Sequence, residues 1–192
     1  MKKEDINTLP NPHLRQKAPK VHVVTDEVRQ LVDDMTAASL DWEDSRPYEI
    51  SAALAAPQVD KLLRIAIVRS SFEEKEQREF TPLINPEIVK AEGAMVADFE
   101  GCLSVKNIYG KVKRHDKIRV KAMDLDGNEV RFKAEGFLAR VIQHEIDHTN
   151  GIVFIDHIRD DPTAFYKLDD KGELKPVDYD EHIKDNDELW ED

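Results

Sequence analysis

The spacing of apolar residues along the chain predicts two helices. In the first, apolar residues recur at intervals of three and four after Thr25, which can cap the helix, so we expect it to run from residue 26 to about residue 40. The second covers residues 136–149, in a segment that begins and ends with glycine, and carries an apolar stripe: Phe137, Leu138, Val141, Ile142 and Ile146. This stripe indicates that the second helix is buried in the core.

The clearest β structure is a hairpin near the middle of the chain. Residues 117–123 alternate apolar and polar positions, Asp126 and Gly127 supply a turn, and residues 129–134 form the returning strand. Strands followed by one central helix, without a repeated strand and helix alternation, predict an α+β fold. We expect mostly antiparallel sheets packed around the helix at residues 136–149.

Three further strands and two irregular segments complete the pattern. Branched apolar residues predict strands at residues 62–68, 81–89 and 94–99, and two prolines favour an edge position for the middle one. Residues 10–20 contain three prolines and are expected to form an extended or turn-rich arm. Residues 41–50 are polar and are expected to form a loop.

A length of 192 residues fits one catalytic domain, which we place at residues 1–170, followed by an acidic tail at residues 171–192. The tail should be solvated and mobile unless Trp190 docks on the domain. The net charge of −12 disfavours direct binding to nucleic-acid phosphates. No apolar stretch is long enough for a membrane span or a signal peptide, so a cytoplasmic location is the simplest expectation.

Residues 144–148 read His-Glu-Ile-Asp-His and indicate a metal site. On a helix, His144 and His148 lie one turn apart on the same face, and Glu145 lies beside them as a candidate general base. The single cysteine, Cys102, cannot form an intramolecular disulfide, and one cysteine with two histidines is a ligand set that leaves a position open for water.

Two simpler interpretations compete with a metal site. A His-Glu-x-x-His sequence can occur by chance on a solvated helix, and a lone cysteine is commonly a small packing residue. The apolar character of residues 136–149 favours the metal, because two histidines and a glutamate are costly to bury without partners. Arg140, one turn before His144, could reach a substrate carbonyl or a carboxylate such as Glu100, or it could form an ordinary structural ion pair.

Three ordered segments give the chain a resemblance to peptide deformylases. These are Glu-Gly-Cys-Leu-Ser at residues 100–104, Gln-His-Glu-Ile-Asp-His at residues 143–148, and Ala-Ala-Pro-Gln at residues 55–58. The resemblance implies hydrolysis of the formyl group from the N-terminal formylmethionine of new polypeptides, with release of formate. It also implies one ion, typically Fe²⁺ with Zn²⁺, Ni²⁺ or Co²⁺ as substitutes, held by three ligands: Cys102, His144 and His148.

The resemblance assigns further roles. Glu145 would take a proton from the metal-bound water and pass it to the leaving amine, while the side chain of Gln58 and the backbone N–H of Leu103 would stabilise the oxyanion. The peptide would bind as an added strand against three residues: Ser51, Ala52 and Ala53.

The chain departs from the family pattern in three places. Ser51 and Ala53 stand where glycine is usual, and we expect both to adopt ordinary extended backbone angles and still offer their backbone to substrate. Thr149 stands where leucine is common and should alter only local packing. The acidic tail replaces the basic helix by which some deformylases reach the ribosome, so proximity to the ribosome would not depend on this tail.

Two alternative functions remain open from the sequence. A general zinc metalloprotease shares the His-Glu-x-x-His motif, but its third ligand usually lies downstream, whereas Cys102 lies upstream. A deformylase-like paralogue could bind the metal with altered or lost turnover because of Ser51 and Ala53. The expected partners are N-formylmethionyl nascent peptides, with no direct nucleic-acid binding and no membrane.

Overall fold

The computed structural model describes residues 1–46, 49–72, 76–169 and 171–190. In these residues seven strands form one sheet, and every neighbouring pair is antiparallel. The sheet order is β1-β2-β3-β4-β6-β7, and β5 pairs with β4 outside this path. The strands are β1 (Ala53–Ala55), β2 (Ile65–Arg69), β3 (Phe80–Cys102), β4 (Val105–Met123), β5 (Glu129–Glu135), β6 (Phe165–Leu168) and β7 (Leu174–Pro176). The expected α+β fold is confirmed.

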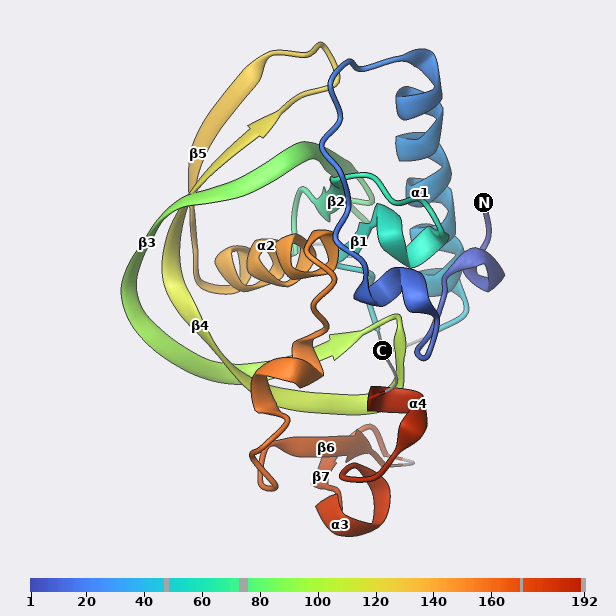
Figure 1. The fold of residues 1–192 in the computed structure, drawn as a ribbon, viewed down its shortest axis with the longest axis vertical. Helices are drawn as coiled ribbons and strands as arrows, with labels where there is room; N and C mark the ends of the chain where they lie inside the picture. The colour runs from blue at the N-terminus through green and yellow to red at the C-terminus, as the bar shows by residue number, and fades with distance from the viewer. Residues whose placement is uncertain (47–48, 73–75, 170, 191–192) are drawn as a thin grey trace.

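The helices are α1 (Asp26–Asp44), α2 (Gly136–Thr149), α3 (Tyr179–His182) and α4 (Asp187–Trp190), together with four short 3₁₀ helices, η1 (Lys3–Asp5), η2 (Pro12–Arg15), η3 (Ala56–Val59) and η4 (Phe154–Ile158). Helices α1 and α2 lie on opposite sides of β1 and β2, whereas α3 and α4 lie beside β6 and β7 (Figure 1). Ile65 and Ile67 of β2 pack with α1, whereas Val68 packs with α2. All five residues of β2 are therefore buried. No helix among the described residues is both long enough and apolar enough to cross a membrane.

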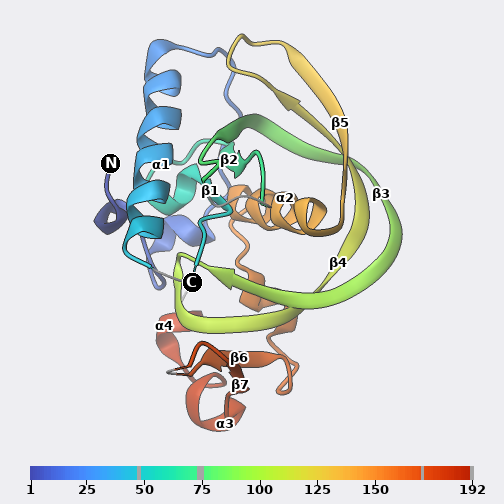
Figure 2. The ribbon, with the colours of Figure 1, turned by 180° about the vertical axis from the view of Figure 1, so that it is seen from behind.

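A long hairpin of β3 and β4 curves around α2 (Figures 1 and 2). Its register shifts at four places, of which three lie along the curve, between Ile84 and Glu87, between Ile88 and Lys90, and between Glu92 and Met95, and one lies at the closed end beside Cys102. Apolar side chains inside the curve pack on α2, including Ile118 and Val120 of β4. The bend brings the closed end of the hairpin, where β3 ends at Cys102, toward the middle of the molecule.

Several sequence predictions are confirmed and others need correction. Helix α2 has the predicted bounds, and β4 pairs with β5 around the predicted turn. Helix α1 continues to Asp44, so the loop predicted from residue 41 begins later, partly because the buried Glu43 forms an ion pair with Arg69. Residues 81–89 do not form an edge strand: they belong to β3, which lies between β2 and β4, and Pro86 falls in a register shift where a missing N–H is tolerated.

The C-terminal segment packs on the domain. The indole Nε1 of Trp190 donates a hydrogen bond of 2.5 Å to the carbonyl of Ile183, and the Arg159 guanidinium lies 4.7 Å from the centre of the indole ring. Ile183 and Leu189 are buried in the same cluster as Phe165. Trp190 therefore docks. The sequence predicted a mobile tail only in the absence of this docking, so the tail is not expected to be mobile.

Candidate metal centre

Helix α2 places the two histidines on its buried face. Their rings lie one turn apart with centroids separated by 4.9 Å, and both are less than one-tenth exposed. The helix ends before Gly151, whose φ of +76° suits glycine and whose missing Cβ allows the carbonyl of Arg15 to approach closely. The N-terminal arm thus closes the end of the helix that carries His148.

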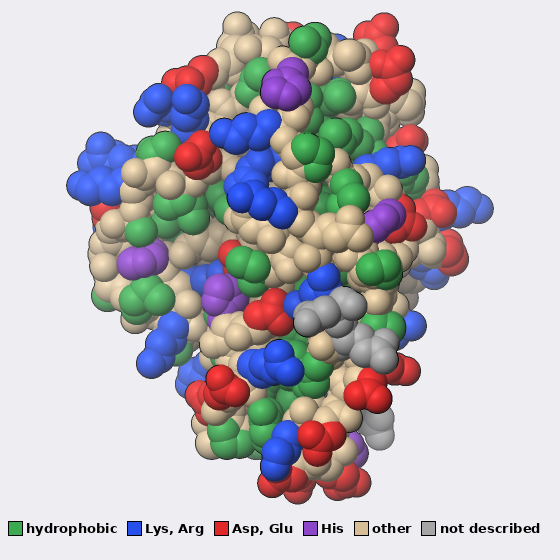
Figure 3. Space-filling view, in the orientation of Figure 1, with side chains coloured by type: hydrophobic (Ala, Val, Ile, Leu, Met, Phe, Trp, Pro, Cys, Tyr) green, Lys and Arg blue, Asp and Glu red, His purple; other side chains and the backbone are tan. Residues whose placement is uncertain are grey.

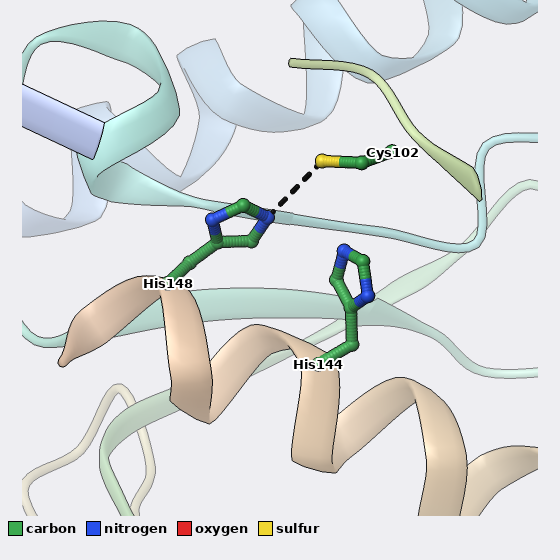
Figure 4. A group of neighbouring side chains, drawn as sticks. All are labelled: Cys102, His144 and His148. Carbon is green, nitrogen blue, oxygen red and sulfur yellow. Dashed lines mark hydrogen bonds between the residues drawn. The ribbon is translucent and has the colours of Figure 1, made fainter. Parts of the chain in front are cut away.

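Cys102 approaches the same point from the closed end of the β3–β4 hairpin (Figure 4). Its Sγ lies 3.2 Å from Nε2 of His148, and the candidate ligand atoms of Cys102, His144 and His148 all lie within 4.8 Å of one another. The structure therefore brings together the three ligands expected from the sequence.

The donor chemistry fits one divalent first-row metal ion. Tetrahedral coordination with bonds of 2.0–2.3 Å places ligand atoms about 3.3–3.8 Å apart, which the separations here allow with small adjustments. A thiolate with two imidazoles is also a set that leaves a coordination position open. Two buried polar atoms, Oε2 of Glu145 and Nδ1 of His148, have no hydrogen-bond partner among the described residues. A cation and its water would give the glutamate oxygen a partner.

A buried carboxylate, Glu100, fixes the orientation of His144. Its Oε2 lies 2.9 Å from Nδ1 of His144, which leaves Nε2 to face Cys102. Arg114 donates two hydrogen bonds to the same carboxylate at 2.9 and 3.0 Å, and Arg140 donates one at 2.7 Å. Burial alone would raise the pKa of Glu100, but His144 and Arg114 hold it well below its usual range. Of the partners considered for Arg140 from the sequence, the structure shows Glu100, with which it forms an ion pair.

The network extends through Arg114 to Asp147, the fourth residue of the motif. Arg114 Nη1 donates to Oδ2 of Asp147 at 2.5 Å, and Nε2 of His157 lies 2.7 Å from the same oxygen. Sequence reasoning missed Arg114 and left His157 without a role. Neither residue lies at helical spacing from Asp147, because Arg114 lies 33 positions away and His157 lies 10 positions away, each on another element.

The charges of the site act on Cys102 and Glu145 in opposite ways. Burial raises the pKa of the Cys102 thiol, but His148 and His144 outweigh it and lower the pKa to about 5. Burial raises the pKa of Glu145 to about 7, although the two histidines oppose this change. The lowered pKa favours the thiolate form of Cys102, which is the form that ligates metals. The raised pKa disfavours the charged form of Glu145 when no metal is bound.

Gln58 on η3 directs its amide donor toward the centre. Its Oε1 accepts a hydrogen bond from the N–H of Ala55 at 2.8 Å, which fixes the orientation of the amide group. Its Nε2 donates to Oγ of Ser104 at 3.0 Å and lies 3.6 Å from Sγ of Cys102. One amide hydrogen therefore lies beside the candidate ligand sulfur, where a bound carbonyl oxygen could receive it.

A cavity of about 300 Å³ connects the candidate metal centre with the free edge of β1. Its walls include the predicted site residues Ala52, Ala53, Gln58, Leu103 and Glu145. They also include apolar side chains to which the sequence analysis gave no role in the site: Ile50, Ile108, Phe137 and Val141. Ser51 does not line this cavity and is only 1 % exposed. The cavity has polar groups at one end and apolar walls, a combination typical of small-molecule and peptide sites.

Two of the three departures from the family pattern now have local explanations. Ser51 and Ala53 both have negative φ, as expected, so neither position requires glycine for its backbone conformation. The hydroxyl of Thr149 donates to the carbonyl of Ile146 at 2.8 Å, and the residue is fully buried at the end of α2. Thr149 thus acts on local helix packing and leaves the candidate ligands unchanged.

A buried helix carrying His-Glu-x-x-His, with a cysteine from a neighbouring strand, is typical of metalloenzymes. Within that class, the model of the family described as polypeptide deformylase matches residues 3–163. A peptide deformylase of Thermomicrobium roseum is 47 % identical over 166 residues, covering 85 % of this chain and 90 % of its own length. The chain belongs to the polypeptide deformylase family.

Solved structures agree with this assignment. A peptide deformylase from Synechococcus elongatus in complex with actinonin superposes with a TM-score of 0.72 and 34 % identity, over 79 % of this chain and 78 % of the other. A peptide deformylase from Acinetobacter baumannii, bound to Met-Ala-Ser, superposes with a TM-score of 0.70 and 32 % identity, over 80 % and 96 % of the two chains.

Proposed function

We propose that this protein is a metal-dependent hydrolase that removes the formyl group from the N-terminal formylmethionine of newly made polypeptides and releases formate. The observation that carries the proposal is that Cys102 and His144, which form one ligand group with His148, line a single cavity together with Gln58 and Glu145. That cavity also reaches the edge of β1, where an extended peptide can pair.

Cys102, His144 and His148 would hold the ion, which we propose to be Fe²⁺, with Zn²⁺, Ni²⁺ or Co²⁺ as substitutes. When bound, such an ion acidifies water and polarises a carbonyl group. Glu145 takes the proton of the attacking water and later delivers it to the amine that leaves as the formyl C–N bond breaks. The side-chain amide of Gln58 and the backbone N–H of Leu103 stabilise the oxygen of the tetrahedral carbon.

The edge strand β1 supplies the substrate platform. In an antiparallel pair, backbone groups of successive residues face alternate sides, and the N–H of Arg69 donates to the carbonyl of Ala52 at 2.8 Å. The N–H and carbonyl of Ala53 consequently face away from β2, toward the cavity. The methionine side chain fits the apolar wall formed by Leu103, Phe137 and Val141.

New polypeptides place this reaction in the cytoplasm and near the ribosome. Acidic side chains gather at the end of the molecule that carries β7 and α3 (Figure 3), and they would be repelled by ribosomal RNA. We therefore assign no ribosome contact to this end of the molecule and no direct nucleic-acid binding to the protein.

The decisive experiment is formate release from formyl-Met-Ala-Ser by protein purified without oxygen and loaded with Fe²⁺ or Ni²⁺. We expect release by the native protein, loss of at least 99 % of the rate in Glu145→Ala, and no cleavage of unformylated Met-Ala-Ser. Metal-loaded native protein that released no formate would overturn the proposal and favour a paralogue without turnover. Cleavage of the unformylated peptide would favour a general metalloprotease.

A further inference from the structure

A buried cluster behind the substrate edge joins α1 to the segment of residues 51–55, which ends with β1. The cluster consists of Glu43, Arg69, Ser39 and Ser51, all at most 2 % exposed. Arg69 Nη1 donates to Oε2 of Glu43 at 2.6 Å, and the same carboxylate oxygen accepts the backbone N–H of Ser51 at 2.9 Å. The hydroxyls of Ser39 and Ser51 lie 2.5 Å apart.

This arrangement decides which backbone groups of residues 51–55 remain for a peptide. The backbone groups of Ser51, Ala53 and Ala55 face the side opposite β2, because Ala52 already accepts the N–H of Arg69. Glu43 takes the N–H of Ser51, and Oε1 of Gln58 takes that of Ala55. Among the described residues, the N–H of Ala53 is the one on this side without a protein acceptor.

We propose that Glu43, held by Arg69, is a positioning residue that fixes this register of the substrate edge and leaves the N–H of Ala53 as the one that this segment donates to the peptide. Arg69 holds the segment twice, through its backbone N–H on Ala52 and through its side chain on Glu43. The expectation that Ser51 offers its own N–H to substrate is replaced by an indirect role, because that N–H is already donated to Glu43.

If the cluster only stabilised the fold, its removal would leave peptide affinity unchanged. Buried ion pairs commonly add little net stability, and replacing both partners with apolar residues of similar size is often neutral or stabilising. Removal of Glu43 and Arg69 together should therefore preserve the fold while releasing the N–H of Ser51. A register role predicts that peptide affinity falls even though the protein stays folded and keeps its metal.

The first test needs no variant. Residue-resolved amide exchange of the native protein, with and without the peptide Met-Ala-Ser, reads each N–H directly. We expect the Ser51 and Ala55 amides to be protected in both states and the Ala53 amide to become protected only when peptide is added. Fast exchange at Ser51 without peptide, or protection of Ala53 that does not change, would overturn the proposal.

The second test uses the double variant Glu43→Leu with Arg69→Met. We expect an unchanged metal content, a kcat within twofold of the native value, and a KM for formyl-Met-Ala-Ser raised about 5- to 30-fold, as for the loss of one or two hydrogen bonds. Met-Ala-Ser should bind more weakly by the same factor. Arg64→Met is the matched control, because it removes another buried arginine, whose partner Asn150 does not line the cavity.

A third variant separates the carboxylate from the hydroxyl pair. Ser39→Ala removes the contact between the two hydroxyls but keeps the N–H of Ser51 that donates to Glu43, so KM should change less than threefold. A KM effect as large as that of the double variant, or a double variant no different from Arg64→Met, would overturn the role of Glu43. The inference rests on the proposed function, but formate release by the native protein tests that function separately, and the exchange and binding measurements require no turnover.

Discussion

Replacing Glu100 by glutamine removes the one charge that joins two buried arginines to His144. The glutamine keeps the size of the side chain and one acceptor oxygen, so the change isolates the charge. Arg114 and Arg140 are 5 % and 6 % exposed and would be left near a neutral amide. His144 would lose the carboxylate that fixes its ring.

The expected cost follows from these contacts. Removing one partner of a buried ion pair typically destabilises a protein by about 3–5 kcal/mol. Arg114 keeps its contact with Asp147, and Arg140 keeps the carbonyl of Val112, so we expect the lower end, about 3 kcal/mol. Loss of the carboxylate behind a metal-binding histidine typically lowers metal affinity about 10- to 100-fold.

Two measurements separate the effects. Urea unfolding of metal-free protein measures the stability change, and competition with a chelator for Ni²⁺ measures the affinity change. Glu92→Gln is the matched control, because Glu92 also accepts hydrogen bonds from an arginine, Arg119, but on the exposed face of the sheet. If Glu100→Gln behaved like Glu92→Gln in both measurements, the assignment of Glu100 as the residue that orients His144 would be wrong.

Two further variants test other parts of the structure. Gln58→Glu keeps the acceptor for the N–H of Ala55 but loses the amide donor. We therefore expect kcat for formate release to fall about 10²- to 10³-fold with metal content unchanged. A decrease of less than tenfold would show that Gln58 does not stabilise the oxyanion. Trp190→Ala removes the contacts of the indole with Ile183 and Arg159. Limited proteolysis after residue 177 should then become several-fold faster while kcat stays unchanged. An unaltered cleavage rate would contradict docking through the indole.

The local part of the site could be predicted from the sequence. A helix fixes the relation of His144 to His148 and of Arg140 to His144, because residues three or four positions apart share a face. Short motifs likewise identified Cys102 and Gln58, since each lies in a family segment. These predictions depend only on spacing along one element or on recognition of a short segment.

The remaining contacts join elements that are distant in sequence. Glu43 and Arg69 lie 26 positions apart, and Glu100 and Arg140 lie 40 apart, so no periodicity relates them. Sequence patterns also divided β3 into two strands, at residues 81–89 and 94–99, because residues 90–93 interrupt the apolar pattern and end in Gly93. In the structure these residues accompany shifts in the register of a continuous hairpin, which only the pairing with β4 reveals.

The two buried carboxylates support different steps, one of them catalysis and the other substrate binding. Glu100 is paired with Arg114 and holds the ring of His144 on α2. Glu43 is paired with Arg69 and holds the backbone of Ser51 at the substrate edge. Because such pairs are costly to bury, their value in this chain is positional. Glu100 should then govern metal affinity and kcat, while Glu43 governs KM. The hydrogen bonds described above join Glu100 and Glu43 to different residues. The effects of Glu100→Gln and of the Glu43 and Arg69 double variant should therefore add within about 0.5 kcal/mol, whereas strong coupling would indicate a single network.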